Sequence, residues 1–249
     1  GQLEALVEKN FVPHLPAVLR EVPRSNVRFE LIKDAWFSGS MNYIGRARKP
    51  DGTPEYEAMY EINAKIEKSQ AEFAHLVSHE VVPGHVTTFA YVQHLYHLGL
   101  VGFESTILTM NTRLSTLFEG IANTALLLAY GVQRIEQLPS AELQLGVLLS
   151  QLEDAAKNNA SYYTYVSKMP TEEIKRRLRN ECLATQERAE KLTEAWAKHP
   201  LMGRAYMPSY RYGTELVMGL LAKHGAAKVI PTLYGGHGLV DCVTIQQKV

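Results

Sequence analysis

Cysteine is scarce in this sequence, which contains two among 249 residues, Cys182 and Cys242. Two cysteines are too few for a disulfide framework, and these two lie too far apart for a C-x-x-C pair. This usage fits a reducing compartment. The sequence also opens without the charged and apolar segments of a secretory signal peptide. We therefore expect a cytoplasmic protein.

An excess of charge is also missing, because 26 basic residues balance 26 acidic ones. No basic stripe with interleaved aromatic residues occurs, so nucleic acid is not an expected partner. No apolar run approaches the roughly 18 residues of a membrane span. The remaining composition, with 46 % apolar and 21 % charged residues, is that of an ordinary globular protein. We expect residues 1–249 to form a single domain.

Residues 78–86, Ser-His-Glu-Val-Val-Pro-Gly-His-Val, contain two histidines and a glutamate. Zinc hydrolases often carry two histidine ligands and a glutamate base as H-E-x-x-H, because residues four apart share one helix face. Here the second histidine comes two positions later than in that motif. Six residues amount to roughly 600° of helical rotation, so His79 and His85 would point about 120° apart on an ideal helix.

Pro83 and Gly84 are the residues that would let the two histidines meet. Proline removes a backbone donor and clashes with the carbonyl four residues back, here that of His79. Glycine adopts backbone angles that other residues avoid. We predict a helix carrying His79 and Glu80, a break between residues 81 and 85, and His85 turned toward the same metal ion. The alternative is a helix end with polar residues nearby, and a continuous straight helix would contradict the metal site.

Glu119 is the expected third metal ligand. It is the only charged residue between Arg113 and Arg134, in a segment that is apolar almost all round and therefore predicted to be buried. A buried carboxylate is costly unless it is paired or binds a metal. Two imidazoles and a carboxylate would leave a fourth position for water, as in catalytic zinc sites. The alternative is a salt bridge from Glu119 to a distant Arg or Lys.

Other polar residues are candidates for supporting roles. His75 shares a helix face with His79 and is either a rival ligand or a residue that supports the ligands. Asn123 and Thr116 lie one turn from Glu119 and would orient it. In the segment that begins at Ser209, Tyr210 could stabilise an oxyanion, and Arg211 and Tyr212 could bind substrate.

The hydrophobic periodicity predicts a mainly α fold of the α+β class. Residues 26–62 contain two alternating segments and a strong turn signal, so we expect a small antiparallel sheet there. An edge of that sheet beside a metal cleft could bind an extended peptide, although a purely structural hairpin is an equal alternative. Helices are expected at residues 64–82, 86–98, 104–130, 140–168, 171–198 and 209–223.

Three segments together resemble a widespread microbial family long catalogued as a domain of unknown function. Its members resemble gluzincin-type zinc peptidases and, distantly, carboxypeptidase Taq and the oligopeptidases. The resemblance covers most of this chain and corresponds to the family's catalytic C-terminal half, which follows an additional N-terminal helical region in its members. The matching segments are His79-Glu80-x-x-Pro83-Gly84-His85, Glu119-Gly120-x-Ala122 and Ser209-Tyr210-Arg211-x-Gly213.

The resemblance implies a helical, zincin-like catalytic domain in which His79, His85 and Glu119 bind one Zn²⁺ ion. Glu80 would be the general base and Tyr210 the oxyanion partner. This chain departs from the family pattern around these positions. Val86 and Thr88 replace a second histidine and a glutamine, Ile121 replaces an aromatic residue, and Leu126 replaces an acidic one.

The sequence therefore predicts a zinc-dependent hydrolase, in the first place a metallopeptidase acting on peptides or small amides. The altered surroundings leave open a metal-dependent hydrolase of non-peptide amides or a biosynthetic tailoring enzyme. A further alternative, from another class, is a non-catalytic helical binding module, which would require a degenerate ligand set. The same ligands would also accept manganese or cobalt.

Overall fold

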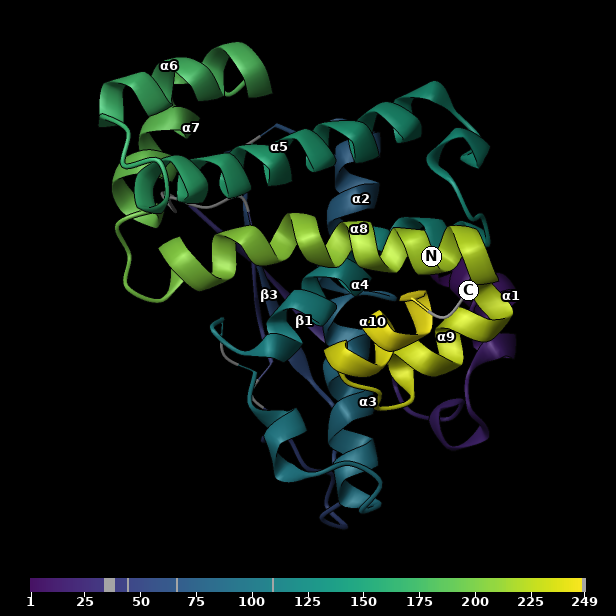
Figure 1. Ribbon diagram of the computed structural model, residues 1–249. Helices are drawn as coiled ribbons and strands as arrows, with labels where there is room; N and C mark the ends of the chain where they lie inside the picture. Colours follow the sequence, from purple (N-terminus) through teal and green to yellow (C-terminus); the bar gives the residue numbers. More distant parts are fainter. Residues whose placement is uncertain (34–38, 44, 66, 109, 248–249) are drawn as a thin grey trace.

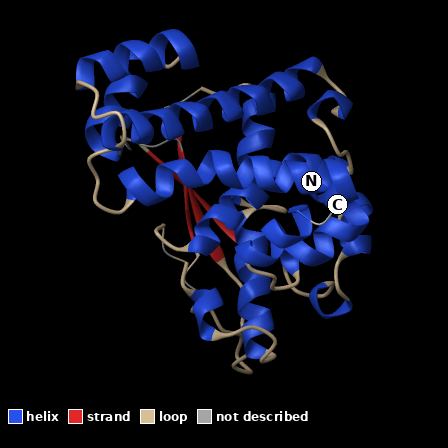
Figure 2. Ribbon diagram, in the orientation of Figure 1, coloured by secondary structure: helices blue, strands red, loops and turns tan. Residues whose placement is uncertain are grey.

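The computed structural model describes residues 1–33, 39–43, 45–65, 67–108 and 110–247, and it confirms the mainly α fold with one small sheet (Figures 1 and 2). Parts of the predicted sheet region, residues 34–38 and 44, lie outside the described residues. The helices are α1 (Gln2–Asn10), α2 (Gln70–Glu80), α3 (His85–His97), α4 (Arg113–Tyr130), α5 (Ala141–Tyr165), α6 (Thr171–Cys182), α7 (Gln186–Glu190), α8 (Met207–His224), α9 (Ala226–Tyr234) and α10 (Leu239–Gln247).

Short 3₁₀ and π-helical turns connect these helices. The 3₁₀ turns are η1 (Val12–His14), η2 (Ala17–Leu19), η3 (Phe103–Thr106) and η4 (Ile135–Gln137). Two π-helical turns, η5 (Lys191–Trp196) and η6 (Met202–Tyr206), precede α8. The single helix expected at 171–198 is thus divided into α6, α7 and η5. The division follows Cys182, where Leu183 adopts a left-handed conformation with φ 54° and ends α6.

The three-stranded sheet has the order β1-β3-β2, with β1 at Val27–Ile32, β2 at Gly39–Asn42 and β3 at Ala58–Asn63. It is mixed, which corrects the expected antiparallel arrangement. The central strand β3 pairs antiparallel with β2, but it pairs parallel with β1, in a register that places Phe29 beside Tyr60. Alternating hydrophobicity fixes which face a side chain occupies, and it carries no information about the direction of the neighbouring strand.

The central helix α4 positions the site. It begins at the cap residue Thr112, ends at Gly131 in a left-handed conformation, and is buried along nearly its whole length. It packs against α8 at two facing glycines: a Cβ on Gly120 would lie 2.2 Å from the Gly213 carbonyl oxygen. Only residues without side chains permit such a close approach of two backbones.

Two clusters of buried apolar side chains support the fold. The larger surrounds α4 and includes side chains from α1, α2, α3, α8 and α9, and the smaller joins α5, α6 and α7. Both cysteines are buried and free. None of the helices in the described part of the chain is long and apolar enough to cross a membrane.

Candidate metal centre

The helix is interrupted between the two motif histidines, as predicted. Helix α2 starts at the cap Ser69, whose side chain and that of Glu72 cap each other's backbone N–H groups, and it ends at Glu80. Helix α3 begins again at His85. Between them, Gly84 passes so close to the end of α2 that a Cβ there would lie 1.8 Å from the His79 carbonyl oxygen. The glycine is therefore required for the turn that brings His85 back toward His79.

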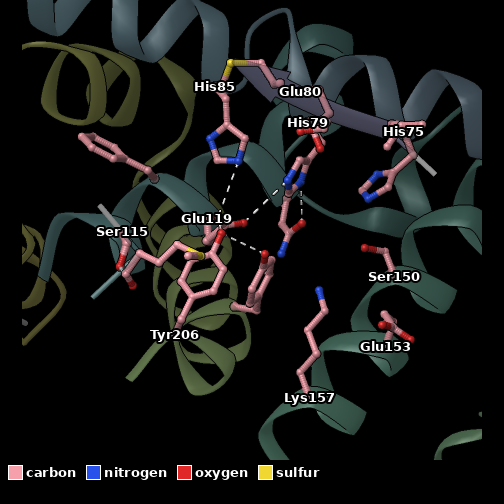
Figure 3. A pocket seen from close by; sticks show the side chains of 18 of the residues that line it. His75, His79, Glu80, His85, Ser115, Glu119, Ser150, Glu153, Lys157 and Tyr206 are labelled. Carbon is pink, nitrogen blue, oxygen red and sulfur yellow. Dashed lines mark hydrogen bonds and ion pairs between the residues drawn. The ribbon is translucent and has the colours of Figure 1, made fainter. Parts of the chain in front are cut away.

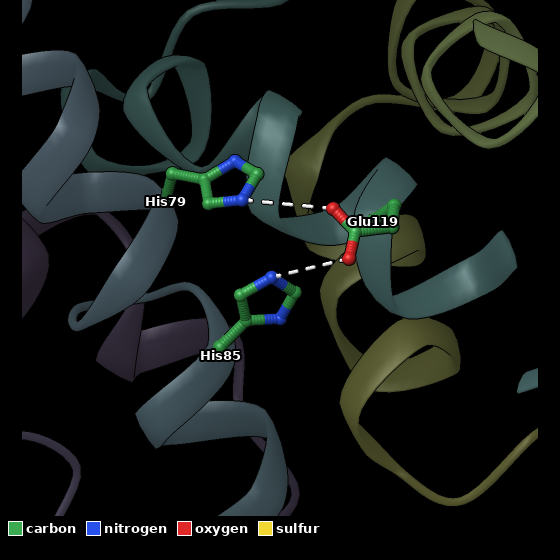
Figure 4. Close-up of side chains that lie close together, drawn as sticks. All are labelled: His79, His85 and Glu119. Carbon is green, nitrogen blue, oxygen red and sulfur yellow. Dashed lines mark ion pairs between the residues drawn. The ribbon is translucent and has the colours of Figure 1, made fainter. Parts of the chain in front are cut away.

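His79, His85 and Glu119 converge on one point (Figure 4). The imidazole rings lie 4.8 Å apart, centroid to centroid. Nε2 of His79 is 3.6 Å from Glu119 Oε2, and Nε2 of His85 is 3.6 Å from Glu119 Oε1. One potential ligand atom from each residue lies within 4.8 Å of the others, so the three could hold a metal ion.

The surroundings of Glu119 fit a bound cation. The residue is 4 % exposed, and its Oε2 is buried without a hydrogen-bond partner among the described residues. The 3.6 Å separation from His79 is too long for a hydrogen bond. A buried carboxylate oxygen in this state is costly, and a metal ion would satisfy it. Two imidazoles and one carboxylate form the protein part of catalytic zinc sites, with room for water.

The protonation states of Glu119 and His79 suit metal binding, whereas His85 would have to give up a proton that Glu119 helps it to hold. Burial opposes the charge on Glu119, but the neighbouring His85 and His79 and the Tyr206 hydroxyl outweigh it and lower its pKa to about 2. Burial lowers the pKa of His79 to about 3, so this imidazole is neutral, which is the ligating form. Burial also disfavours the charged form of His85, but the Glu119 carboxylate prevails and raises its pKa.

Asn123 supports His79 rather than Glu119. Its Oδ1 lies 2.8 Å from His79 Nδ1, while its Nδ2 donates to Asp154 Oδ2 at 2.7 Å and to Thr214 Oγ1 at 2.8 Å. With both amide hydrogens used in this way, the oxygen accepts the Nδ1 hydrogen of His79 and leaves Nε2 free to ligate a metal. Thr116 instead donates to Ser209 Oγ at 3.0 Å.

Tyr206 is a site residue that the sequence reasoning missed. Its hydroxyl donates to Glu119 Oε1 at 2.5 Å, and the Tyr210 hydroxyl donates to that of Tyr206 at 2.9 Å. Tyr206 is the last residue of the π-helical turn η6, and it precedes the helix that we expected over residues 209–223. The available signal was its spacing, because it lies four positions before Tyr210 and shares its helix face.

Glu80 and His75 both line the same pocket as the ligand set. Burial raises the pKa of Glu80 to about 7. His75 lies outside the group of three, with its ring 6.4 Å from that of His79, centroid to centroid. Its Nδ1 is buried without a partner among the described residues. The structure therefore favours the supporting role for His75 over the role of a direct ligand.

Arg211 and Tyr212 do not reach the pocket. Arg211 is exposed and pairs through Nε with Glu215 Oε1 at 2.8 Å, and Tyr212 is 51 % exposed. Each residue rotates the helix by about 100°, so the turn that points Tyr210 inward points the next two side chains outward. The structure thus places both residues outside the pocket in which we expected them to bind substrate.

The site opens into a cavity of about 750 Å³ (Figure 3). Strand β2, an edge of the sheet, contributes Gly39, Ser40 and Met41 to its wall. Another part of the cavity wall is formed by α5, α7 and η5. A cavity of this size is typical of sites for small molecules or short peptide segments.

No family model and no curated protein sequence matches this chain. Among solved structures, its fold is similar to that of a candidate lipoprotein from Colwellia psychrerythraea, with a TM-score of 0.63 and 15 % sequence identity. The similarity covers 98 % of this chain and 41 % of that protein, so this chain spans about two fifths of its length. At this identity the similarity shows a shared fold alone.

Proposed function

We propose that this chain is the catalytic domain of a zinc-dependent hydrolase that cleaves peptide or small amide bonds. The observation that supports this most strongly is the convergence of His79, His85 and Glu119 at the wall of a cavity that Glu80 also lines. A zinc ion bound by these three residues would lower the pKa of a water molecule to near neutrality. The resemblance to gluzincin-type peptidases supports the same assignment.

The protein's own groups would supply proton transfer and charge stabilisation. Glu80 follows a ligand directly in the sequence and borders the cavity, so it would accept the proton of the attacking water and pass it to the leaving amine. The Tyr206 hydroxyl donates to Glu119 and the Tyr210 hydroxyl to Tyr206, so Tyr210 would turn its single hydrogen from Tyr206 to a developing oxyanion.

Two observations favour a peptide as substrate. Edge strand β2 borders the cavity, where an extended peptide could pair with its backbone. The departures from the family pattern at Val86, Thr88, Ile121 and Leu126 are all buried, and none of the four lines the cavity. These substitutions therefore give little reason to prefer a non-peptide amide hydrolase or a tailoring enzyme. The intact ligand set argues against a non-catalytic module.

Metal analysis of the purified protein tests the proposal. We expect about one zinc per chain in the parent protein and background levels in His79→Ala, because a site with two remaining ligands binds weakly. His97→Ala, which removes an exposed histidine at the end of α3, is the matched control and should keep its metal. Absence of metal above background in the parent would refute the metal site.

The role of Glu80 requires a second measurement. Glu80→Gln should retain zinc and lose peptide hydrolysis by roughly 10²- to 10⁴-fold, since a glutamine cannot accept the proton. Hydrolysis that is insensitive to this substitution would rule out the mechanism while leaving the metal site intact.

A further inference from the structure

Lys157 is a buried cation in the wall of the candidate active site. It lies on α5, is 8 % exposed, and extends its amine toward the centre of the cavity (Figure 3). Its Nζ donates to Asp154 Oδ1 at 3.1 Å and lies 3.4 Å from the centroid of the Tyr210 ring. A lysine ammonium has three donors. Among the described residues, Asp154 accepts one and the Tyr210 ring covers part of the amine, so at least one donor remains for a ligand.

The Asp154 carboxylate forms an ion pair with Lys157 and also accepts hydrogen bonds from neutral partners. Its Oδ2 accepts hydrogen bonds from Asn123 and Thr214, and through Asn123 it also supports His79. Lys157 is in turn linked to the metal site by contact, since Tyr210 bonds to Tyr206 and Tyr206 to Glu119. A substrate group bound by Lys157 would therefore lie close to a scissile bond held at the candidate metal site.

The wall around Lys157 is the cationic side of the cavity. Among the described residues, the lysine and arginine side chains that line the cavity are Lys157, Arg188 and Lys191, on α5, α7 and η5. Arg188 is paired with Glu153 and lies over the ring of Trp196, as does Lys191. The Nε1 donor of Trp196, a cavity residue, is buried without a partner among the described residues. This wall offers positive charge and hydrogen-bond donors to an anionic ligand.

We propose that Lys157 binds a carboxylate of the substrate, so that the enzyme acts on small peptides or N-acyl amino acids with a free carboxylate next to the scissile amide. This inference rests on the proposed hydrolase function and specifies its substrate class. It replaces Arg211, which faces solvent, as the residue that recognises a carboxylate. A lysine provides a compact point charge for such a group.

Binding of matched probes to the metal-free protein tests the subsite independently of catalysis. Benzoyl-glycyl-phenylalanine should bind about 10- to 100-fold more tightly than its C-terminal amide by calorimetry, the range expected for one charge-assisted hydrogen bond. Lys157→Met should abolish this preference and Lys157→Arg should retain part of it. Lys198→Met, which removes an exposed lysine outside the cavity, should leave it unchanged.

One further probe and one further variant extend this experiment. Benzoyl-glycyl-glutamic acid α-amide carries its carboxylate on the side chain. Tight binding of this probe would show that Lys157 recognises a side-chain carboxylate and not the carboxylate next to the scissile amide. Because Lys157→Met leaves Asp154 buried without its cation, the double variant Asp154→Asn/Lys157→Met provides a neutral pair if the single variant does not fold.

The outcomes separate this inference from the proposed function. Equal binding of acid and amide by the parent, or a preference that survives in Lys157→Met, would overturn the subsite. If zinc-loaded parent protein hydrolyses neither probe but the preference still depends on Lys157, the hydrolase proposal fails and the carboxylate subsite stands. In an active enzyme, Lys157→Met should lower kcat/KM for the acid about 10- to 100-fold and change that for the amide little.

Discussion

Asn123 determines which nitrogen of His79 faces the metal site, through the hydrogen bond between its Oδ1 and His79 Nδ1. Residues that orient a ligand in this way commonly contribute 10- to 100-fold to metal affinity, as an order of magnitude. We expect Asn123→Ala to weaken zinc binding by about that factor, because the imidazole can then rotate and change tautomer. Competition with a chelating dye measures the affinity.

A control on α5 shows whether such a loss is specific. Asn158→Ala removes a partly buried amide that contacts Asn159 and does not line the cavity. Its zinc affinity should equal that of the parent. Equal affinity in Asn123→Ala as well would mean that the hydrogen bond to His79 does not support the ligand.

Asp154 gives the stability a predictable pH dependence. Burial raises the pKa of its carboxyl, and Lys157 opposes the rise without reversing it. A carboxyl whose pKa is raised on folding contributes its full stability below its unfolded pKa of about 4, and loses it as the pH rises through the folded value. The stability of the parent relative to Asp154→Asn should therefore fall as the pH rises. Urea unfolding of both metal-free proteins from about pH 4 upward measures this difference in the free energy of unfolding. A difference that rises with pH would contradict a raised pKa for Asp154.

At the residue scale, the grouping of His79, His85 and Glu119 could be predicted because each residue has a local signal. His79 and His85 stand in a motif with a helix breaker, and Glu119 is a lone charge in an apolar helix. Lys157 has no such signal, and Tyr206 has only its spacing of four from Tyr210, since tyrosines and lysines are common on helices of every kind. Their roles depend on how α5, η6 and α4 pack together, and tertiary packing leaves no trace in local spacing.

Among the helices, the contact of α4 with α8 depends on glycine. We expect Gly120→Ala to destabilise the protein by about 1–3 kcal/mol or more, because its Cβ would overlap the Gly213 backbone and force the two helices apart. Gly146→Ala on α5 is the matched control. There the nearest atoms lie 3.7 Å from the added Cβ, so the substitution should stabilise the protein by about 0.5–1 kcal/mol.

Denaturant unfolding of the two alanine variants compares Gly120, which lies against the backbone of α8, with Gly146, which has room for a Cβ. The expected signs are opposite, which excludes a general effect of adding a methyl group to a helix. A Gly120→Ala variant as stable as the parent would show that α4 and α8 can separate at little cost. Because Glu119 precedes Gly120, the same variant should also bind zinc less tightly.

At the element scale, the sequence predicted breaks better than pairings. Pro83 and Gly84 indicated the end of α2 because both act on the backbone locally. The parallel pairing of β1 with β3 was not predicted, since partner and direction depend on where β2 and its flanking segments run. The end of α6 at Leu183 was also missed, because no glycine or proline marks it.

On the scale of the whole molecule, the cavity draws on elements distributed along most of the chain. Its wall runs from β2 through α2, α4 and α5 to α8, so the metal ligands, the edge strand and Lys157 depend on one another for position. The two apolar clusters share α5 and α8, and the cavity residues come from elements of both. A ligand that joins α2, α3 and α4 should therefore stabilise more than its immediate surroundings.

Removal of the metal tests this coupling. A ligand that binds only the folded state at 100 times its Kd stabilises that state by about 2.7 kcal/mol. For a protein of this size, about 1 kcal/mol corresponds to roughly 2–4 °C in Tm, so chelation should lower the Tm by about 5–10 °C. Calorimetry of the parent with zinc, with chelator, and with zinc restored measures this shift. His85→Ala should show no shift, because Glu119 and His79 alone cannot hold the ion against the chelator. If the parent contains stoichiometric zinc but its Tm does not change on chelation, the metal lies outside the site formed by the three helices.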